Sequence, residues 1–435
     1  MKKLILFLIA GMTLLPVVAN AQARIDIDGN KRKVATSDAD IQGNKASRAA
    51  TWVTRGNVYY AAAIAPIGGV YKGMGEAEAR LLVGSPSETK TEEVNGDTYN
   101  VWVYPHFDLY FVPEYGQVLF WKQKTFIAEN ALGVAVDAYK KAVELDSKQD
   151  SKVKPLLEKI VDAYKQDADV AFTAGDYPVA AKAFANAYNL SVDPLVNAPD
   201  TLAAYNAGYV AILGEDFPHA LEYLKASEKL GYTQDGELYF LLYHAYQGVN
   251  DQTAAENALK EGVQKYPSNS RLIESLIFHY TSTGQDASQM IPLVESALQK
   301  DPNNFIYHFG LGIIYDKLND FDKSAAEFGK ASQLNPEDFS SAFNEGITYV
   351  RHGESMNEEL NGIPMNEQQR YEAKLGEINA LYRKAIPAFE KSHALNPTDI
   401  NTIELLKSLF FRFRDDSPEM MQSYDKYNEL LKTLQ

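Results

Sequence analysis

Side chains that could carry acid–base or metal chemistry are spread along the chain rather than gathered into motifs. None of the seven histidines has another histidine or a cysteine three or four residues away, the spacing that brings two metal ligands to one face of a helix. The chain has no cysteine, which excludes thiolate chemistry and disulfides. The nucleophile elbow G-x-S-x-G, the zinc motif H-E-x-x-H and the glycine-rich phosphate loops are also absent. These absences predict a protein that is not an enzyme and holds no cofactor.

One acidic stretch, Asp26-x-Asp28-Gly29, has the beginning of a calcium loop. It lacks the further carboxylates that complete such a site, so we expect no metal there.

Length and charge narrow the class of protein. A chain of 435 residues is too long for one compact core, which predicts an extended array or several domains. The formal net charge is −16. Such a surface repels phosphate backbones, so nucleic acid is not expected as a partner.

Residues 1–21 have the pattern of a secretory signal peptide. Lys2 and Lys3 precede an apolar run, and Ala19-Asn20-Ala21 is a small-residue cleavage site. The run is too short for a transmembrane anchor, and the absence of cysteine excludes a lipoprotein. We expect a periplasmic protein, with secretion beyond the outer membrane as the alternative. Cleavage would leave Gln22 first, which resembles exported proteins of the Bacteroidota, and residues 22–36 are expected to be a flexible tether.

The elements that would position any functional side chain are helical pairs. Between Phe305 and Pro336, apolar residues three and four apart form two stripes separated by Asn319-Asp320. Gly312 on the first stripe and Ala331 on the second would let the helices approach closely. The sequence therefore predicts a helical hairpin with one apolar side left to pack on a neighbour.

The same pattern recurs at intervals of 35 and 34 residues. Its three marks are a closing proline, a small residue five positions earlier and a bulky residue three positions before that. They are Pro267, Pro302 and Pro336; Gly262, Ala297 and Ala331; and Leu259, Val294 and Phe328. Period and pattern resemble the tetratricopeptide repeat (TPR), a helix–turn–helix unit of 34 residues. The resemblance implies a mainly α fold, an α-solenoid of about seven hairpins, with the array occupying 153–435. An excursion near 351–377 is either a surface loop or an extension of the helices.

The first repeat is expected to be split. Trp52, Gly56 and Tyr59 have first-helix spacing within 37–65, and a matching second helix falls at 128–146. Residues 66–127 between them read as a small α+β insert, because a short helix is followed by four strand-like runs. The runs are 89–94, 98–104, 108–112 and 117–121, and Asn95-Gly96 predicts a tight hairpin turn between the first two.

The opening of the insert, Gly73-Met74 followed by a helix and Val83-Gly84-Ser85-Pro86, resembles the SmpA/OmlA (BamE-like) module of envelope proteins. An unrelated α+β insert remains open.

In the repeat family, the first helix of each hairpin lines a concave groove. The resemblance implies that seven residues line it here: Tyr205, Tyr209, Phe240, His244, His279, Phe309 and Phe343. Aromatic rings on rigid helices suit apolar or extended-peptide partners. The alternative is that these side chains form the core between repeats. His244 and His279 would hold equivalent places in successive repeats, where ordinary groove lining is expected rather than a metal-binding or pH-sensitive pair.

These observations favour an exported, non-catalytic scaffold or adaptor that binds a protein or peptide partner in the cell envelope. The alternative is a periplasmic glycan- or nutrient-binding accessory protein, in which Trp102, Trp121 or Tyr110 would stack on sugar rings. The sequence predicts neither the identity of the partner nor the oligomeric state.

Overall fold

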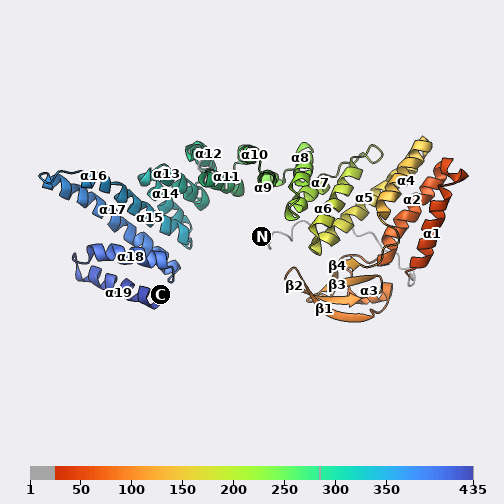
Figure 1. Ribbon diagram of the computed structural model, residues 1–435, viewed down its shortest axis with the longest axis horizontal. Helices are drawn as coiled ribbons and strands as arrows, with labels where there is room; N and C mark the ends of the chain where they lie inside the picture. Colours follow the sequence, from red (N-terminus) through yellow and green to blue (C-terminus); the bar gives the residue numbers. More distant parts are fainter. Residues whose placement is uncertain (1–24, 284–285, 435) are drawn as a thin grey trace. The chain divides into compact units, whose positions relative to one another are not determined.

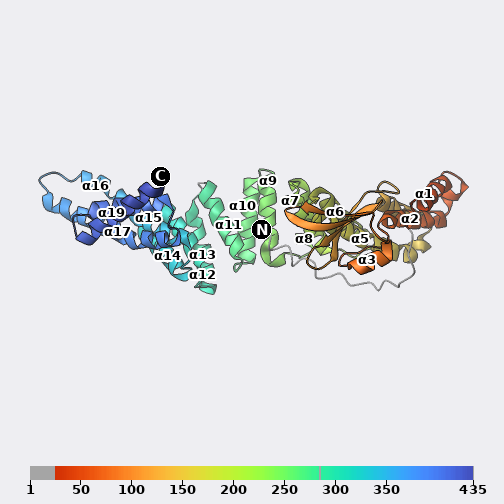
Figure 2. The same ribbon diagram turned by 90° about the horizontal axis from the view of Figure 1, so that it is seen from below.

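The computed structural model describes residues 25–283 and 286–434; the expected signal peptide, 1–21, lies outside them. The chain divides into two compact units, Met1–Tyr232 (unit 1) and Thr233–Gln435 (unit 2). Both are built from helical hairpins, and unit 1 also contains one four-stranded antiparallel sheet (Figures 1 and 2). This confirms the predicted fold class.

Unit 1 pairs α2 with α4, α5 with α6, and α7 with α8, while α1 packs on α2 and the sheet lies between α2 and α4 in the sequence. Its elements are α1 Ile27–Asp40, α2 Ala49–Ile64, α3 Glu76–Val83, β1 Glu88–Val94, β2 Asp97–Val103, β3 Phe107–Val112, β4 Gln117–Gln123, α4 Ala131–Leu145, α5 Asp150–Thr173, α6 Tyr177–Ser191, α7 Thr201–Leu213 and α8 Phe217–Lys229.

Unit 2 continues the pairing with α9 and α10, α13 and α14, α15 and α17, and α18 and α19. Its helices are α9 Glu237–Gly248, α10 Gln252–Lys265, α11 Ser270–Thr283, α12 Ile291–Lys300, α13 Phe305–Lys317, α14 Phe321–Leu334, α15 Phe339–Ser355, α16 Asn357–Asn361, α17 Gln368–Leu395, α18 Ile400–Phe413 and α19 Pro418–Leu434. The segment near 351–377 therefore consists largely of the end of α15, the short α16 and the start of a 28-residue α17.

Several hairpins have a glycine on the first helix directly beneath a bulky residue on the second. A Cβ built on Gly312 would lie 2.7 Å from the ring of Phe328, and one built on Gly346 would lie 2.7 Å from Phe389. Because those distances are shorter than atoms tolerate, only glycine lets these helices pack so closely.

The turns share a local cause. In four hairpins of the array a residue with positive φ is followed by an aspartate whose carboxylate caps the second helix. Asp176, Asp216, Asp251 and Asp320 accept hydrogen bonds from the backbone N–H three residues on, which satisfies an otherwise unpaired donor. The turn residue and the cap together fix where each second helix begins.

The prediction of a flexible tether over 22–36 is wrong for residues 27–36, which belong to α1. The Asp26 carboxylate caps this helix by accepting from the N–H of Gly29 at 2.7 Å. Only Ile27, Gly29 and Ser37 are buried in α1. A helix at the end of an array packs on one side only, which explains why its sequence is polar and lacks a clear period.

The sheet of the insert has strand order β1-β2-β3-β4 and is covered on both faces. One face carries Trp102, Leu109 and Phe111 in a core with Met74 and Ala79, the latter from α3. The other carries Val101, Tyr110 and Phe120 against residues of α5. Asn95 and Gly96 both have positive φ, as a two-residue hairpin turn of the predicted kind requires.

The Glu92 carboxylate links β1 to residues of β3 and β4, so its protonation at low pH should destabilise the sheet. Its carboxylate bonds with Lys90 at 2.9 Å, Lys122 at 3.0 Å and the Tyr110 hydroxyl at 2.9 Å. These bonds, with the Lys90 bond foremost, lower the pKa of Glu92 from 4.5 to about 2.

A group with a depressed pKa stabilises the fold above its unfolded pKa, and that contribution is lost as the pH falls through the folded value. We therefore expect Glu92→Gln to cost on the order of 1 kcal/mol at pH 7, a value discounted for solvent screening. The difference in unfolding free energy between Glu92→Gln and wild type should shrink as the pH falls from 4.5 to about 2. Urea unfolding of both proteins at several pH values measures it, and a difference that is constant with pH would refute the assignment.

Candidate functional site

The residues expected to line a groove divide into two groups. Tyr209, Phe240, His244, Phe309 and Phe343 are half-buried on first helices and keep part of their rings at the surface. Tyr205 and His279 are buried, at 6% and 1% exposed. The expectation that these two contribute contact surface is corrected, because both are part of the packing between helices.

His279 sits among polar groups of α10 and α11. Its Nε2 is buried without a hydrogen bond, 3.9 Å from a Glu256 carboxylate oxygen. Burial lowers the pKa of His279, so the imidazole is neutral at pH 7. The ring of Tyr243 contacts both His279 and His244, at centroid distances of 5.8 and 5.2 Å. Within the described residues no group of three or more histidine or acidic side chains could hold a metal ion.

In unit 2, the exposed side of α9 carries a connected polar and aromatic group. Phe240 packs edge-to-face on His244 at 4.3 Å, and the Arg271 guanidinium of α11 lies 4.9 Å from the Phe240 ring. Arg271 also bonds to Glu237 at 2.6 Å. Burial, with a smaller contribution from the charge of Arg271, lowers the pKa of His244. The cluster therefore presents a neutral imidazole, an aromatic face and one ion pair.

Phe309 and Phe343 occupy the places equivalent to Phe240 in later hairpins, but they turn partly inward. The Phe309 ring meets Phe328 at 5.4 Å, and the Phe343 ring meets Phe389 at 5.7 Å. Each ring thus supports its own hairpin with one edge and leaves the other edge accessible. We use the name first-helix face of unit 2 for Phe240, His244, Phe309 and Phe343.

In unit 1, the corresponding side of α5 is already covered by the insert. Lys72 donates to Asp169 at 2.9 Å and to Thr173 at 3.4 Å. The turn residue Asn95 lies directly against Gly175 at the α5–α6 turn. The insert therefore contacts the C-terminal end of α5 through Lys72 and Asn95, and Asp169 and Thr173 face the insert rather than a partner.

Replacing Lys72 with methionine tests this anchoring. The pair is about one-fifth exposed, so leaving Asp169 without its cation should cost about 1–2 kcal/mol in unfolding free energy. Lys124→Met is the matched control, because the Lys124–Asp108 pair is more exposed on its lysine side and local to the sheet; it should cost less than about 0.5 kcal/mol. Equal losses in thermal unfolding would show that the Lys72 contact does not anchor the insert.

Ion pairs at the repeat period were missed by sequence reasoning. Lys165 bonds to Asp200 at 3.1 Å, and Arg351 pairs with Asp316. Such pairs link one hairpin to the next in the same way that Arg271 and Glu237 do. Opposite charges 34 or 35 positions apart were visible in the sequence and were the signal that could have located them.

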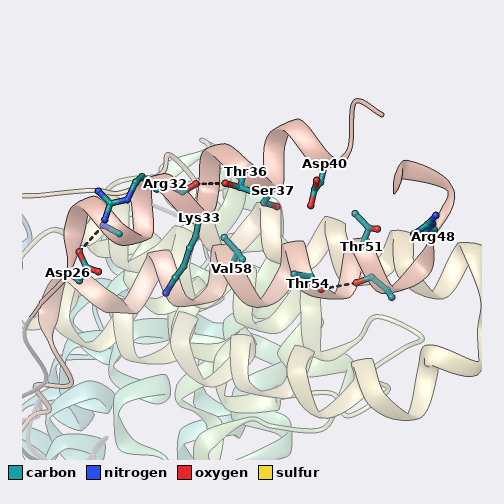
Figure 3. Close-up of a pocket in the computed structure, with 12 residues that line it drawn as sticks. Asp26, Arg32, Lys33, Thr36, Ser37, Asp40, Arg48, Thr51, Thr54 and Val58 are labelled. Carbon is teal, nitrogen blue, oxygen red and sulfur yellow. Dashed lines mark hydrogen bonds between the residues drawn. The ribbon is translucent and has the colours of Figure 1, made fainter. Parts of the chain in front are cut away.

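An open groove of about 650 Å³ lies between α1 and α2 (Figure 3). Arg32 and Lys33 lie toward one end, and Asp40 and Arg48 toward the other. The hydroxyls of Thr36 and Thr54 bond to carbonyls of their own helices. With charges of both signs and these hydroxyls already bonded, the groove offers no single ligand chemistry.

No protein-family model matches the chain, and no curated protein matches it. Solved structures with similar folds include MamA, at 16% identity and TM-score 0.33, over 44% of this chain and 95% of that one. YrrB, described as a TPR protein with an unusual peptide-binding site, matches at 15% identity and TM-score 0.36, over 52% and 97%. A TPR repeats protein of Bacteroides fragilis NCTC 9343 matches at 15% identity and TM-score 0.31, over 62% and 98%.

Each unit is a TPR-like array of helical hairpins. Because the TM-scores are low, this assignment rests on the hairpin pairing and on the small-beneath-bulky contacts described above. No helix among residues 25–283 and 286–434 is long and apolar enough to cross a membrane.

Proposed function

We propose that this chain is a non-catalytic scaffold that binds a protein or peptide partner on the first-helix face of unit 2. The observation that carries the proposal is a set of half-buried rings at equivalent places on three first helices of unit 2, α9, α13 and α15. Phe240, Phe309 and Phe343 are each fixed by a neighbouring ring or guanidinium and keep part of their surface accessible. Rigid aromatic side chains bury a large area at low entropic cost, which suits them to partner recognition.

The proposed location is the cell envelope, with the periplasm preferred over secretion beyond the outer membrane. Its support is the leader pattern of residues 1–21. We also propose that the insert is a SmpA/OmlA-like module and that the protein is of the exported Bacteroidota type, on the sequence resemblances given above. N-terminal sequencing of protein from the periplasmic fraction should begin at Gln22; an uncleaved Met1 would contradict export by this leader.

The three aromatic residues on which the glycan-binding alternative depended are buried in unit 1. Trp102, Trp121 and Tyr110 are 4%, 5% and 1% exposed, so they fill the two cores of the insert and cannot stack on a sugar ring. No other described feature favours a glycan over a peptide.

Site-specific photocrosslinking of the full-length chain tests the scaffold proposal. A benzophenone amino acid replaces Phe240 or Phe309, and matched controls replace Asn257 and Lys330, which are exposed on second helices α10 and α14. Illumination in envelope extract should join the same protein to both first-helix positions and to neither control. Crosslinking that is absent, or equally strong at the controls, would overturn the proposal.

A further inference from the structure

A groove of about 510 Å³ lies at the C-terminal end of unit 2, between α15, α17 and α18. Its volume is in the range of ligand-binding pockets. Four of its lining residues, at positions 405, 408, 409 and 412, follow one face of α18. The complete lining is Val350, Glu354, Tyr382, Leu405, Ser408, Leu409, Phe411, Arg412 and Arg414.

The inner wall of this groove is apolar and closely packed. Tyr382 and Leu409 are 8% and 6% exposed, and Val350 and Leu405 are half-buried beside them. A Cβ on Gly353 would lie 2.6 Å from the Tyr382 ring, so the glycine lets α15 come up against that ring. Tyr382 and Leu409 are therefore the covered floor of the groove, and Val350 and Leu405 keep part of their apolar surface accessible.

Two arginines stand at the rim, and each is held in place by aromatic packing. Arg412 lies 4.9 Å from the Tyr382 ring, and its Nε donates to Asn379 at 2.8 Å. Arg414 lies 3.8 Å from the Phe411 ring, and its Nη1 donates to the Phe411 carbonyl at 2.7 Å. Stacking and one hydrogen bond fix each guanidinium plane, so little freedom is lost when a carboxylate binds.

One positive charge in the groove lacks a carboxylate partner. Arg414 pairs with Asp415 at 3.7 Å, whereas Arg412 has no carboxylate within ion-pair distance among the described residues. Glu354 is the one acidic residue in the lining. In a chain of net charge −16, this leaves a local site for a negative group. The chain's general repulsion of an acidic partner is screened beyond about 8 Å at physiological ionic strength.

We propose that this groove binds an acidic peptide segment in which an aspartate or glutamate stands next to a bulky apolar residue. The carboxylate pairs with the free Nη groups of Arg412 and with Arg414, and the apolar side chain packs on the half-buried Val350 and Leu405. Planar guanidinium groups favour this bidentate recognition of carboxylates. The inference rests on the proposed scaffold function and specifies the chemistry of one partner segment.

Selection from a display library of random twelve-residue peptides, against the immobilised full-length chain, tests the proposal without assuming a partner. Enriched peptides should pair Asp or Glu with Leu, Ile, Phe or Trp, and selection against the Arg412→Gln/Arg414→Gln double variant should not enrich them. Fluorescence anisotropy of the best labelled peptide should then show at least a tenfold rise in Kd for Arg412→Gln and a smaller rise for Arg412→Lys. Arg370→Gln, an exposed arginine of α17 that pairs with Glu367, is the matched control and should leave Kd unchanged.

Enrichment of basic peptides, enrichment of the same peptides by wild type and double variant, or no enrichment at all would overturn the inference. Thermal unfolding of each variant checks that the fold is intact. Crosslinking at Phe240 and Phe309 tests the scaffold proposal independently of the peptide selection. If it succeeds while the peptides fail, the scaffold proposal stands and the arginine groove does not.

Discussion

Replacement of Phe389 by alanine is expected to lower the free energy of unfolding by about 3–5 kcal/mol, the range for removing a fully buried aromatic ring. Phe389 is 0% exposed, contacts the Phe343 ring at 5.7 Å and fills the space above Gly346. Its loss leaves a cavity between α15 and α17, because backbone on both sides limits collapse. Chemical unfolding monitored by circular dichroism measures the change.

Phe126→Ala is the matched control, since that ring is 68% exposed and its loss should change stability by less than about 0.5 kcal/mol. If the two variants lose the same stability, Phe389 is not the centre of its hairpin.

Replacement of Gly312 by leucine should cost about 2–3 kcal/mol, because the new side chain would enter the ring of Phe328. The gain in helix propensity on replacing glycine offsets about 0.8 kcal/mol of the steric cost. The loss should be visible as a lower midpoint in urea unfolding, with little change in slope.

A double-mutant cycle with Phe328→Ala identifies the contact. The small alanine makes room for the leucine, so the double variant should be more stable than the sum of the single losses predicts, by at least about 1 kcal/mol. Strictly additive losses would mean that residues 312 and 328 do not face each other.

The hairpins could be predicted from sequence because their cause is local. Gly312 and Phe328 stand sixteen positions apart on either side of Asn319-Asp320, and the structure shows the glycine beneath the ring and the aspartate capping α14. The antiparallel sheet was predictable for the same reason, since Asn95-Gly96 fixes its first turn.

What the sequence could not predict depends on the position of a residue in the array. Helix α1 was predicted to be a tether because an end helix buries few residues and shows little period. Tyr205 and His279 were expected at the surface because periodicity identifies a helix and its face but not how deeply neighbouring hairpins cover it. The Lys72–Asp169 contact joins residues 97 positions apart, so no local sequence pattern predicts it.

The candidate site in unit 2 was partly accessible to sequence reasoning. Phe240, Phe309 and Phe343 were placed on first helices by the repeat period. Arg412 and Arg414 were not singled out. The stacking partner of Arg412, Tyr382, lies on α17, so no spacing along α18 indicates that contact. Phe411 lies three positions before Arg414, so that contact could have been inferred from the sequence.

Hydrogen–deuterium exchange of the full-length chain, with and without the partner captured by crosslinking, tests the central claim most directly. The account predicts that the partner slows exchange in α9, α13 and α15, whose side chains form the first-helix face of unit 2. Exchange in the second helices α10 and α14 should be unchanged. Protection centred on α10 and α14, or on the exposed strand β1, would contradict it.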